Sequence, residues 1–239
     1  MRRFFLTVNV IVATMFSVAG VAMAGPPQIT RAYYDEPTTR YPHGALGDDT
    51  EYGALVLVLS NGQKRRIRLP DTSVFEDTAP RLADLDGDGA PEVITVEALA
   101  SQGARLAIFG ADGLFAATEP IGTRFRWLAP AGIGDLDGDG RVEIAYVDRP
   151  HLAKVLRVVR FNDGQLQPIA ARRGFSNHQF GAPDIVGGLR HCGDRTEVIL
   201  ASGDWQSLMA VELADQELKA ARLGPYSATA IERALECRD

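Results

Sequence analysis

Short apolar runs alternate with polar turns along the chain, and the alternation repeats at a constant interval. Each of four runs is six or seven residues long, rich in Val, Leu, Ile and Ala, and followed by a turn that contains Asp or Asn. Such a run and turn predict a β-strand that enters a hairpin. The turns are 51, 51 and 52 residues apart, which indicates four repeat units. The runs occupy residues 54–59, 104–109, 155–161 and 208–213, and the turns 60–62, 111–113, 162–164 and 214–216.

A second repeated feature is an acidic loop. In its first copy Asp84, Asp86 and Asp88 alternate with other residues, Gly89 follows, and Glu92 stands at the ninth position. The same spacing returns 51 residues later. Carboxylates this close repel one another unless a cation neutralises them, and hard oxygen ligands favour Ca²⁺. The sequence therefore predicts two Ca²⁺ sites, the second with Asp135, Asp137, Asp139 and Glu143.

Two other interpretations of the acidic loops were considered. An EF-hand would have Glu at the twelfth position and helices on both sides, but that position is Thr95 in one copy and Tyr146 in the other, between β-branched runs. An acidic hairpin turn, in which Asp and Gly serve backbone geometry alone, remains open. Two copies in the same register make it the weaker interpretation.

The repeats predict an all-β fold, a small β-propeller of about four four-stranded blades. The third loop, 187–197, has lost its aspartates, and we expect no calcium there. Residues 230–237 resemble 184–192, which predicts a last strand that completes the unit begun by strands 29–34, 54–59 and 64–69. Pairing of the N- and C-terminal strands would then close the ring. A two-sheet sandwich is the alternative, although it does not explain a constant period.

The N-terminus has the features of an export signal. Two arginines precede an apolar stretch that ends in Ala22-Met23-Ala24, a cleavage site for a signal peptide over residues 1–24. An uncleaved membrane anchor is the alternative. Cleavage leaves one domain, 25–239, with no stable membrane insertion and a formal charge that falls from −6 to −8. We expect a periplasmic or extracellular protein that does not bind nucleic acid.

The chain has two cysteines, Cys192 and Cys237. They occupy nearly equivalent loop positions in neighbouring units, and an oxidising compartment favours a disulfide between them. A pair of free thiols is the alternative.

The two acidic loops with their flanking Glu-Val and Glu-Ile resemble the FG-GAP or VCBS repeats of integrin α-subunit propellers and of many secreted bacterial proteins. The resemblance covers residues ~75–170, while the rest of the chain reads as decayed copies. It implies two structural Ca²⁺ ions, with the backbone carbonyls of Ala90 and Arg141 as additional ligands. Our first functional hypothesis is a non-catalytic interaction module.

A partner would then bind the face opposite the calcium loops. Its candidate residues combine aromatic and polar side chains, and we expect a protein or a glycan as partner. The alternative is that these residues pack between blades. A hydrolase or lyase that uses His178 or a channel carboxylate (Glu76, Asp77, Asp204 or Glu232) is the alternative function, although the four histidines lack metal-ligand spacing. The candidates for the ligand face are Arg126, Trp127, Asn177, His178 and Tyr226.

Overall fold

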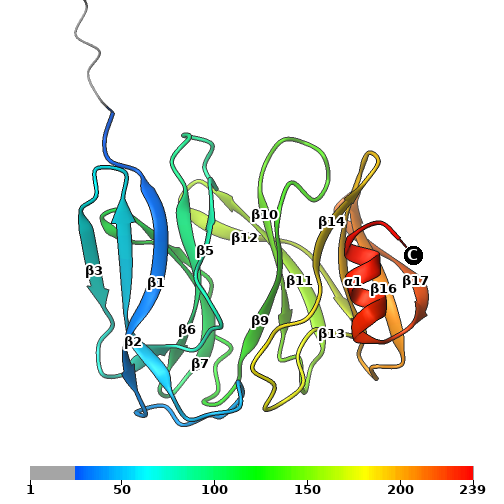
Figure 1. Cartoon of the computed structure of the whole chain (residues 1–239), viewed down its shortest axis with the longest axis horizontal. Helices are drawn as coiled ribbons and strands as arrows, with labels where there is room; N and C mark the ends of the chain where they lie inside the picture. Colours follow the sequence, from blue (N-terminus) through cyan, green and yellow to red (C-terminus); the bar gives the residue numbers. More distant parts are fainter. Residues whose placement is uncertain (1–24, 239) are drawn as a thin grey trace, which may run out of the picture.

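The structure, a computed structural model, describes residues 25–238 and is almost entirely β. Four successive units of antiparallel strands follow one another across the molecule, from β1–β3 on the left of Figure 1 to β14–β17 on the right. The first unit has three strands, β1 (Ile29–Thr38), β2 (Glu51–Leu59) and β3 (Lys64–Arg68).

The other three units have four strands each. The second contains β5 (Arg81–Ala83), β6 (Glu92–Leu99), β7 (Gly103–Gly110) and β8 (Gly113–Ala117). The third contains β9 (Leu128–Gly134), β10 (Glu143–Asp148), β11 (Val155–Asn162) and β12 (Gln165–Arg173). The fourth contains β14 (Gly188–Cys192), β15 (Arg195–Ser202), β16 (Ser207–Ala214) and β17 (Glu217–Pro225). Two short strands, β4 (Ser73–Phe75) and β13 (Phe175–Ser176), precede the second and fourth units.

The predicted hairpins are all present. Each of the four turns lies between the last two strands of its unit. In the fourth hairpin both Asp215 and Gln216 have positive φ, 57° and 60°, the conformation whose twist matches that of paired strands. The turn therefore forms although it lacks the glycine that makes the other three easy to recognise.

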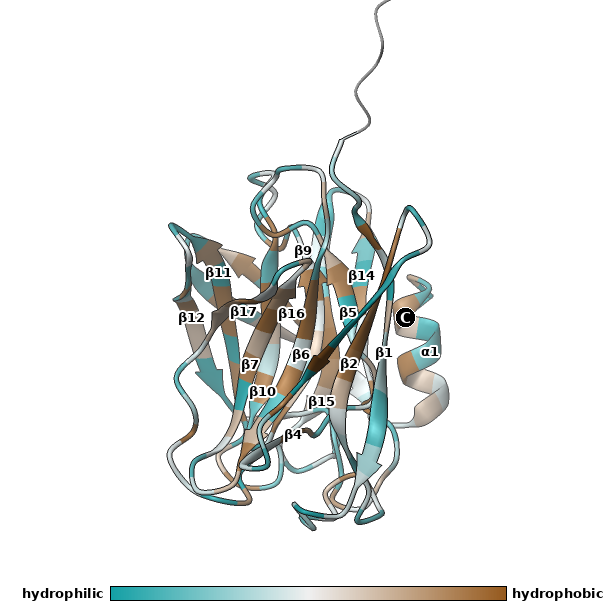
Figure 2. Cartoon of the chain, turned by 90° about the vertical axis from the view of Figure 1, so that its left-hand side faces the viewer, coloured by the Kyte–Doolittle hydropathy of each residue, from teal (hydrophilic) through white to brown (hydrophobic). Residues whose placement is uncertain are grey.

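The core lies between neighbouring units and is built by strands that are apolar on both faces. In β10, Ile144 and Tyr146 pack toward the second unit, whereas Ala145 and Val147 pack toward the fourth. This alternation follows from the two-residue period of a strand. Figure 2 shows the same hydrophobic character along β2 and β6, in contrast to the paler, more polar β1.

The predicted closure by terminal strands is wrong. The segment after β17 is a helix, α1 (Ala228–Leu235), which packs on β14 and β15. Ser227 caps it by accepting a hydrogen bond from Ala230 N at 3.0 Å, and Ile231 and Ala234 are buried on one face. Alanine-rich composition behind a serine cap favours a helix over a strand. Within residues 25–238, β1 pairs only with β2.

The units also differ from isolated blades. β4 pairs with both β2 and β6, so the first two units share one eight-stranded sheet. The first and last units approach through loops, where Gly181 N–H donates to Ala45 O at 2.9 Å. The all-β fold of four repeated units is thus confirmed, without the predicted pairing of terminal strands.

Among residues 25–238, no helix has both the length and the apolar character needed to cross a membrane. The predicted signal peptide, residues 1–24, lies outside the described residues.

Candidate functional site

The first acidic loop, between β5 and β6, is held by hydrogen bonds from its own backbone. Both carboxylate oxygens of Asp84 accept, one from Gly87 N at 2.8 Å and the other from Gly89 N at 2.9 Å. Gly87 and Gly89 have φ of 80° and 86°, which an L side chain rarely adopts. The glycines therefore allow the chain to curl around the Asp84 carboxylate.

Three carboxylates gather inside this curl. Asp84, Asp86 and Glu92 each place an oxygen within 4.8 Å of the other two. Glu92 is buried at the start of β6, and one of its oxygens accepts from Leu85 N at 2.9 Å. Burial raises the pKa of Glu92, and the neighbouring aspartates raise it further against the hydrogen bond from Leu85. A cation here would stabilise charges that otherwise repel one another.

The second loop, between β9 and β10, has the same backbone geometry. Asp135 accepts from Gly138 N at 2.7 Å and from Gly140 N at 2.8 Å, and Glu143 accepts from Leu136 N at 2.9 Å. Its three gathered carboxylates are Asp135, Asp137 and Glu143. The two loops are thus structural copies, as their sequences predicted.

A cationic side chain distinguishes the second loop from the first. The guanidinium of Arg160, on β11, donates to Asp137 and Asp139 at 2.9 Å each and also to Glu143. Val159 pairs with Ile144 as Phe109 pairs with Val93, so Arg160 corresponds to Gly110 of the second unit. The first loop therefore has no such arginine from its partner strand.

The other predicted ligands do not belong to the two groups of three carboxylates. Asp88 and Asp139 lie outside the two groups of three, and their carboxylates accept from Ala90 N at 2.7 Å and Arg141 N at 2.9 Å. The carbonyls of Ala90 and Arg141 stay predicted ligands.

The two cysteines form a disulfide. Cys192 ends β14, Cys237 follows α1, and their Cα atoms are 5.8 Å apart. The bridge fastens the C-terminal helix rather than the closing strand that the repeat alignment predicted. Disulfides of this kind are typical of oxidising, exported locations.

Three of the five residues predicted for the ligand face are buried. Trp127, Asn177 and His178 are at most 2% exposed. Asn177 donates to the carbonyls of Ala129 and Pro130. Arg126 is half-buried, and Tyr226 contacts Trp205 edge to face at 4.9 Å, in the fourth unit. Interior packing therefore accounts for Asn177 and His178, whereas Trp127, although buried, also lines a pocket beside His43 and His151.

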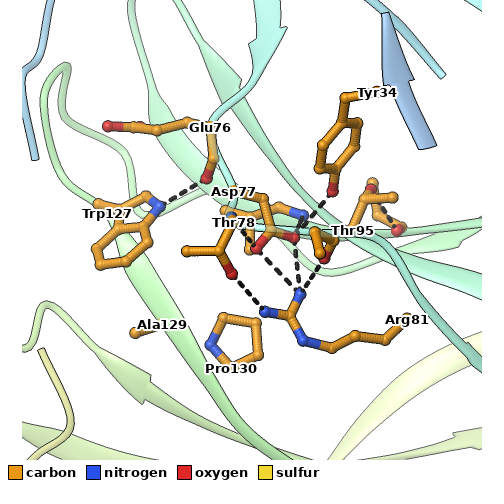
Figure 3. A network of polar contacts seen from close by, with 12 residues as sticks. Tyr34, Glu76, Asp77, Thr78, Arg81, Thr95, Trp127, Ala129 and Pro130 are labelled. Atoms are coloured by element: carbon orange, nitrogen blue, oxygen red, sulfur yellow. Dashed lines mark hydrogen bonds and ion pairs between the residues drawn. The ribbon is translucent and has the colours of Figure 1, made fainter. Parts of the chain in front are cut away.

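The channel carboxylates named as possible acids or bases do not converge as a set. Asp204 and Glu232 are exposed. Asp77 is buried, and its carboxylate already has partners: it accepts a hydrogen bond from Tyr34 Oη at 2.9 Å and pairs with Arg81 (Figure 3). These contacts make Asp77 a structural anchor between the first two units.

Glu76 has a different environment. Its side chain is fully buried, one oxygen meets His43 Nδ1 at 2.5 Å, and the other has no hydrogen-bond partner. Burial raises the pKa of Glu76, although the contact with His43 lowers it. The Glu76 carbonyl accepts from Trp127 Nε1 at 2.7 Å, as Figure 3 shows.

Sequence reasoning missed that two of the four histidines, His151 and His178, are in contact. His151 and His178 are joined at 2.9 Å, and Phe180 contacts both His43 and His151 edge to face. These residues come from loops far apart in the sequence, so no local spacing signals their proximity.

Comparison with known proteins agrees with the loop geometry. A search of curated proteins found no match to the chain. The model of the FG-GAP-like repeat matches residues 84–146, a span that begins at the first acidic loop and contains the second. The chain therefore carries an FG-GAP-like repeat, which confirms the resemblance drawn from the two loops.

Proposed function

We propose that the protein is an exported, calcium-binding, propeller-like interaction module without catalytic activity, in which two Ca²⁺ ions hold the acidic loops. The observation that carries the proposal is the repeated gathering of three carboxylates, Asp84, Asp86 and Glu92 in one loop and Asp135, Asp137 and Glu143 in the other. Carboxylate-rich loops of this kind suit Ca²⁺, which accepts irregular coordination, better than Mg²⁺, which requires near-ideal octahedral geometry.

The position of the loops supports a structural role for the ions. Each loop connects the first two strands of its unit, and Glu92 and Glu143 are the first residues of β6 and β10. Calcium would therefore tie the short strands β5 and β9 to the apolar strands of the core. A ligand that binds only the native state raises the unfolding free energy.

Calcium stoichiometry and thermal melts test the proposal directly. The purified protein should melt at a higher temperature in millimolar Ca²⁺ than in chelator, and calorimetric titration should give two sites per chain. Asp86→Asn should remove the first site and Asp137→Asn the second. Asp194→Asn is the matched control, because this exposed aspartate lies in the turn of the third loop. Equal melting temperatures with and without Ca²⁺, together with no bound metal, would contradict the proposal.

The two ends of β10 support the interaction role. β10 begins at the second acidic loop and ends at a cluster of aromatic and basic side chains around His151. A partner at this end, a protein or a glycan, would leave the calcium loops free to act as scaffold. Pull-down from the native envelope with and without Ca²⁺ would test for such a partner.

The disulfide supports export, and N-terminal sequencing of the mature protein would test cleavage before Gly25.

A hydrolase or lyase is the second candidate function, and the contact between His43 and Glu76 favours it. A buried carboxylate at 2.5 Å from Nδ1 orients the imidazole and leaves Nε2 available for proton transfer. Hydrolysis of a panel of nitrophenyl esters and glycosides, abolished by His43→Asn, would support this function. Activity that persists in that variant would count against it.

A further inference from the structure

Loops from all four units line a half-open cavity of about 170 Å³ at the end of the molecule opposite the acidic loops. It lies where β10 ends and β9 begins, so the length of both strands separates it from the second loop. Its walls include Phe125, Trp127 and Phe180, with His43 and His151 beside them.

The size of the cavity sets the size of a ligand. An apolar cavity of about 150 Å³ accommodates one benzene molecule. A space of about 170 Å³ therefore fits a single six-membered aromatic ring with one small substituent.

The aromatic walls are held in place by their neighbours. Phe125 stacks on His43 with ring centroids 5.2 Å apart, and Trp127 lies parallel to His151 at 6.3 Å. The Trp127 indole is fixed by its hydrogen bond to the Glu76 carbonyl. Walls that are already ordered reduce the entropy lost when a ring enters.

The charge of the cavity wall indicates which substituent the bound ring carries. Arg149 is neutralised by Asp148, and His43 contacts Glu76. Arg126, half-buried in the wall, donates to the Phe125 carbonyl and has no carboxylate partner within residues 25–238. Burial lowers the pKa of His151 to about 4, so this imidazole is neutral at pH 7. Arg126 is thus an unneutralised cation in the cavity wall, where a carboxylate would be stabilised. The Arg124 guanidinium, 4.4 Å from the centre of the Phe125 ring, adds a second positive charge beside the same wall.

The mouth of the cavity is apolar and exposed. Phe180 and Leu152 are 61% and 62% exposed, although large hydrophobic side chains are usually covered. They are two of the four large hydrophobic side chains that are exposed among residues 25–238. Apolar residues gathered at the mouth of a cavity are typical of a binding site.

We propose that this cavity binds a small single-ring aromatic carboxylate, with its ring among Phe125, Trp127 and Phe180 and its carboxylate at Arg126. The cavity lies within the cluster at which the proposed partner would bind, but this ligand needs neither the partner nor calcium in order to bind. Its ligand contacts come from segments that do not contribute to the acidic loops.

Tryptophan fluorescence provides the test, with benzoate as the probe. The chain has two tryptophans, and Trp205 lies in the fourth unit against Tyr226. In a Trp205→Phe background, emission therefore reports on Trp127 alone. Benzoate should change this emission saturably, whereas acetate, which lacks the ring, should have no effect. Benzyl alcohol, which lacks the charge, should bind at least tenfold more weakly than benzoate.

Two variants separate the role of the charge from that of the ring. Arg126→Gln should weaken benzoate binding at least tenfold and leave benzyl alcohol binding unchanged, while Phe180→Ala should weaken both. Arg195→Gln, at an exposed arginine in the third loop, is the charge-matched control and should have no effect. Melting temperatures establish that each variant is folded.

The outcomes decide the proposal in either direction. Saturable benzoate binding that depends on Arg126 supports it. Emission that shows no saturation with benzoate, or binding that Arg126→Gln leaves unchanged, overturns it. Running each titration in chelator and in Ca²⁺ separates this site from the calcium loops, because either proposal can then fail alone.

Discussion

Arg160 on β11 pairs with Glu143 on β10, and the same guanidinium reaches two further carboxylates of the second acidic loop. Its side chain is 12% exposed, so these ion pairs are largely shielded from water. The first loop has Gly110 at the corresponding place. Two loops that are copies in sequence and backbone therefore differ in charge, since one is partly neutralised by the protein itself.

The first prediction follows from this difference. Arg160→Gln removes the internal cation and leaves the four carboxylates of the second loop to repel one another, which should destabilise the protein by roughly 2 kcal/mol in chelator. In saturating Ca²⁺ the loss should be smaller, because the ion replaces the lost charge. Denaturant unfolding with and without Ca²⁺ measures both values.

Calcium affinity provides an independent measurement on the same variant. Arg160 competes with a cation for Asp137 and Glu143, so Arg160→Gln should tighten the second site and leave the first unchanged. Arg65→Gln is the matched control, since Arg65 pairs with the exposed Asp112 in another unit. Equal affinities in the variant and the parent protein would show that Arg160 does not compete with the ion.

The second prediction concerns Glu51, at the start of β2. It is 1% exposed, and one of its oxygens has no hydrogen-bond partner. Burial raises its pKa to about 9, with further contributions from Glu76, Asp48 and Asp77. In the unfolded chain its pKa is about 4.3. The folded state thus keeps a proton that the unfolded chain releases between these two values.

The sign of the pH effect follows from proton linkage. Stability that depends on protonated Glu51 is fully present below about pH 4 and is lost as the pH rises toward 9. Glu51→Gln mimics the protonated form and should raise the unfolding free energy at pH 7 by about 2–3 kcal/mol, with little effect at pH 4. Thermal melts between pH 4 and pH 9 measure this change in unfolding free energy. Glu119→Gln, at an exposed glutamate, is the control. A gain that is the same at both pH values would contradict the shifted pKa.

Local signals in the sequence predicted the repeating part of the fold. The hairpin turns at 60–62, 111–113, 162–164 and 214–216 form because turn chemistry acts over a few residues. The acidic loops were equally predictable, since their ligands lie within nine residues of one another.

Features that depend on tertiary contacts were not predictable in this way. The repeat alignment assigned a strand to residues 230–237, but a serine cap and the burial of Ile231 and Ala234 produce a helix. The cavity around Trp127 combines residues from loops more than 100 positions apart, such as His43 and His151. The role of Arg160 was not predicted either, because it depends on the register between β10 and β11.

The third prediction concerns the disulfide and α1. The bridge between Cys192 and Cys237 closes a segment of 45 residues, and its loss should cost roughly 3–4 kcal/mol. The melting temperature should then fall by roughly 10 °C in a phosphine reductant. The bridge joins Cys192, at the end of β14, to Cys237, just after α1. Reduction should therefore increase amide hydrogen exchange in α1 more than in β6 or β10. A variant with both cysteines changed to Ala is the control, and reductant should leave its melt unchanged. A parent protein whose melt and exchange do not respond to reduction would show that the apolar contacts of Ile231 and Ala234 suffice to hold the helix.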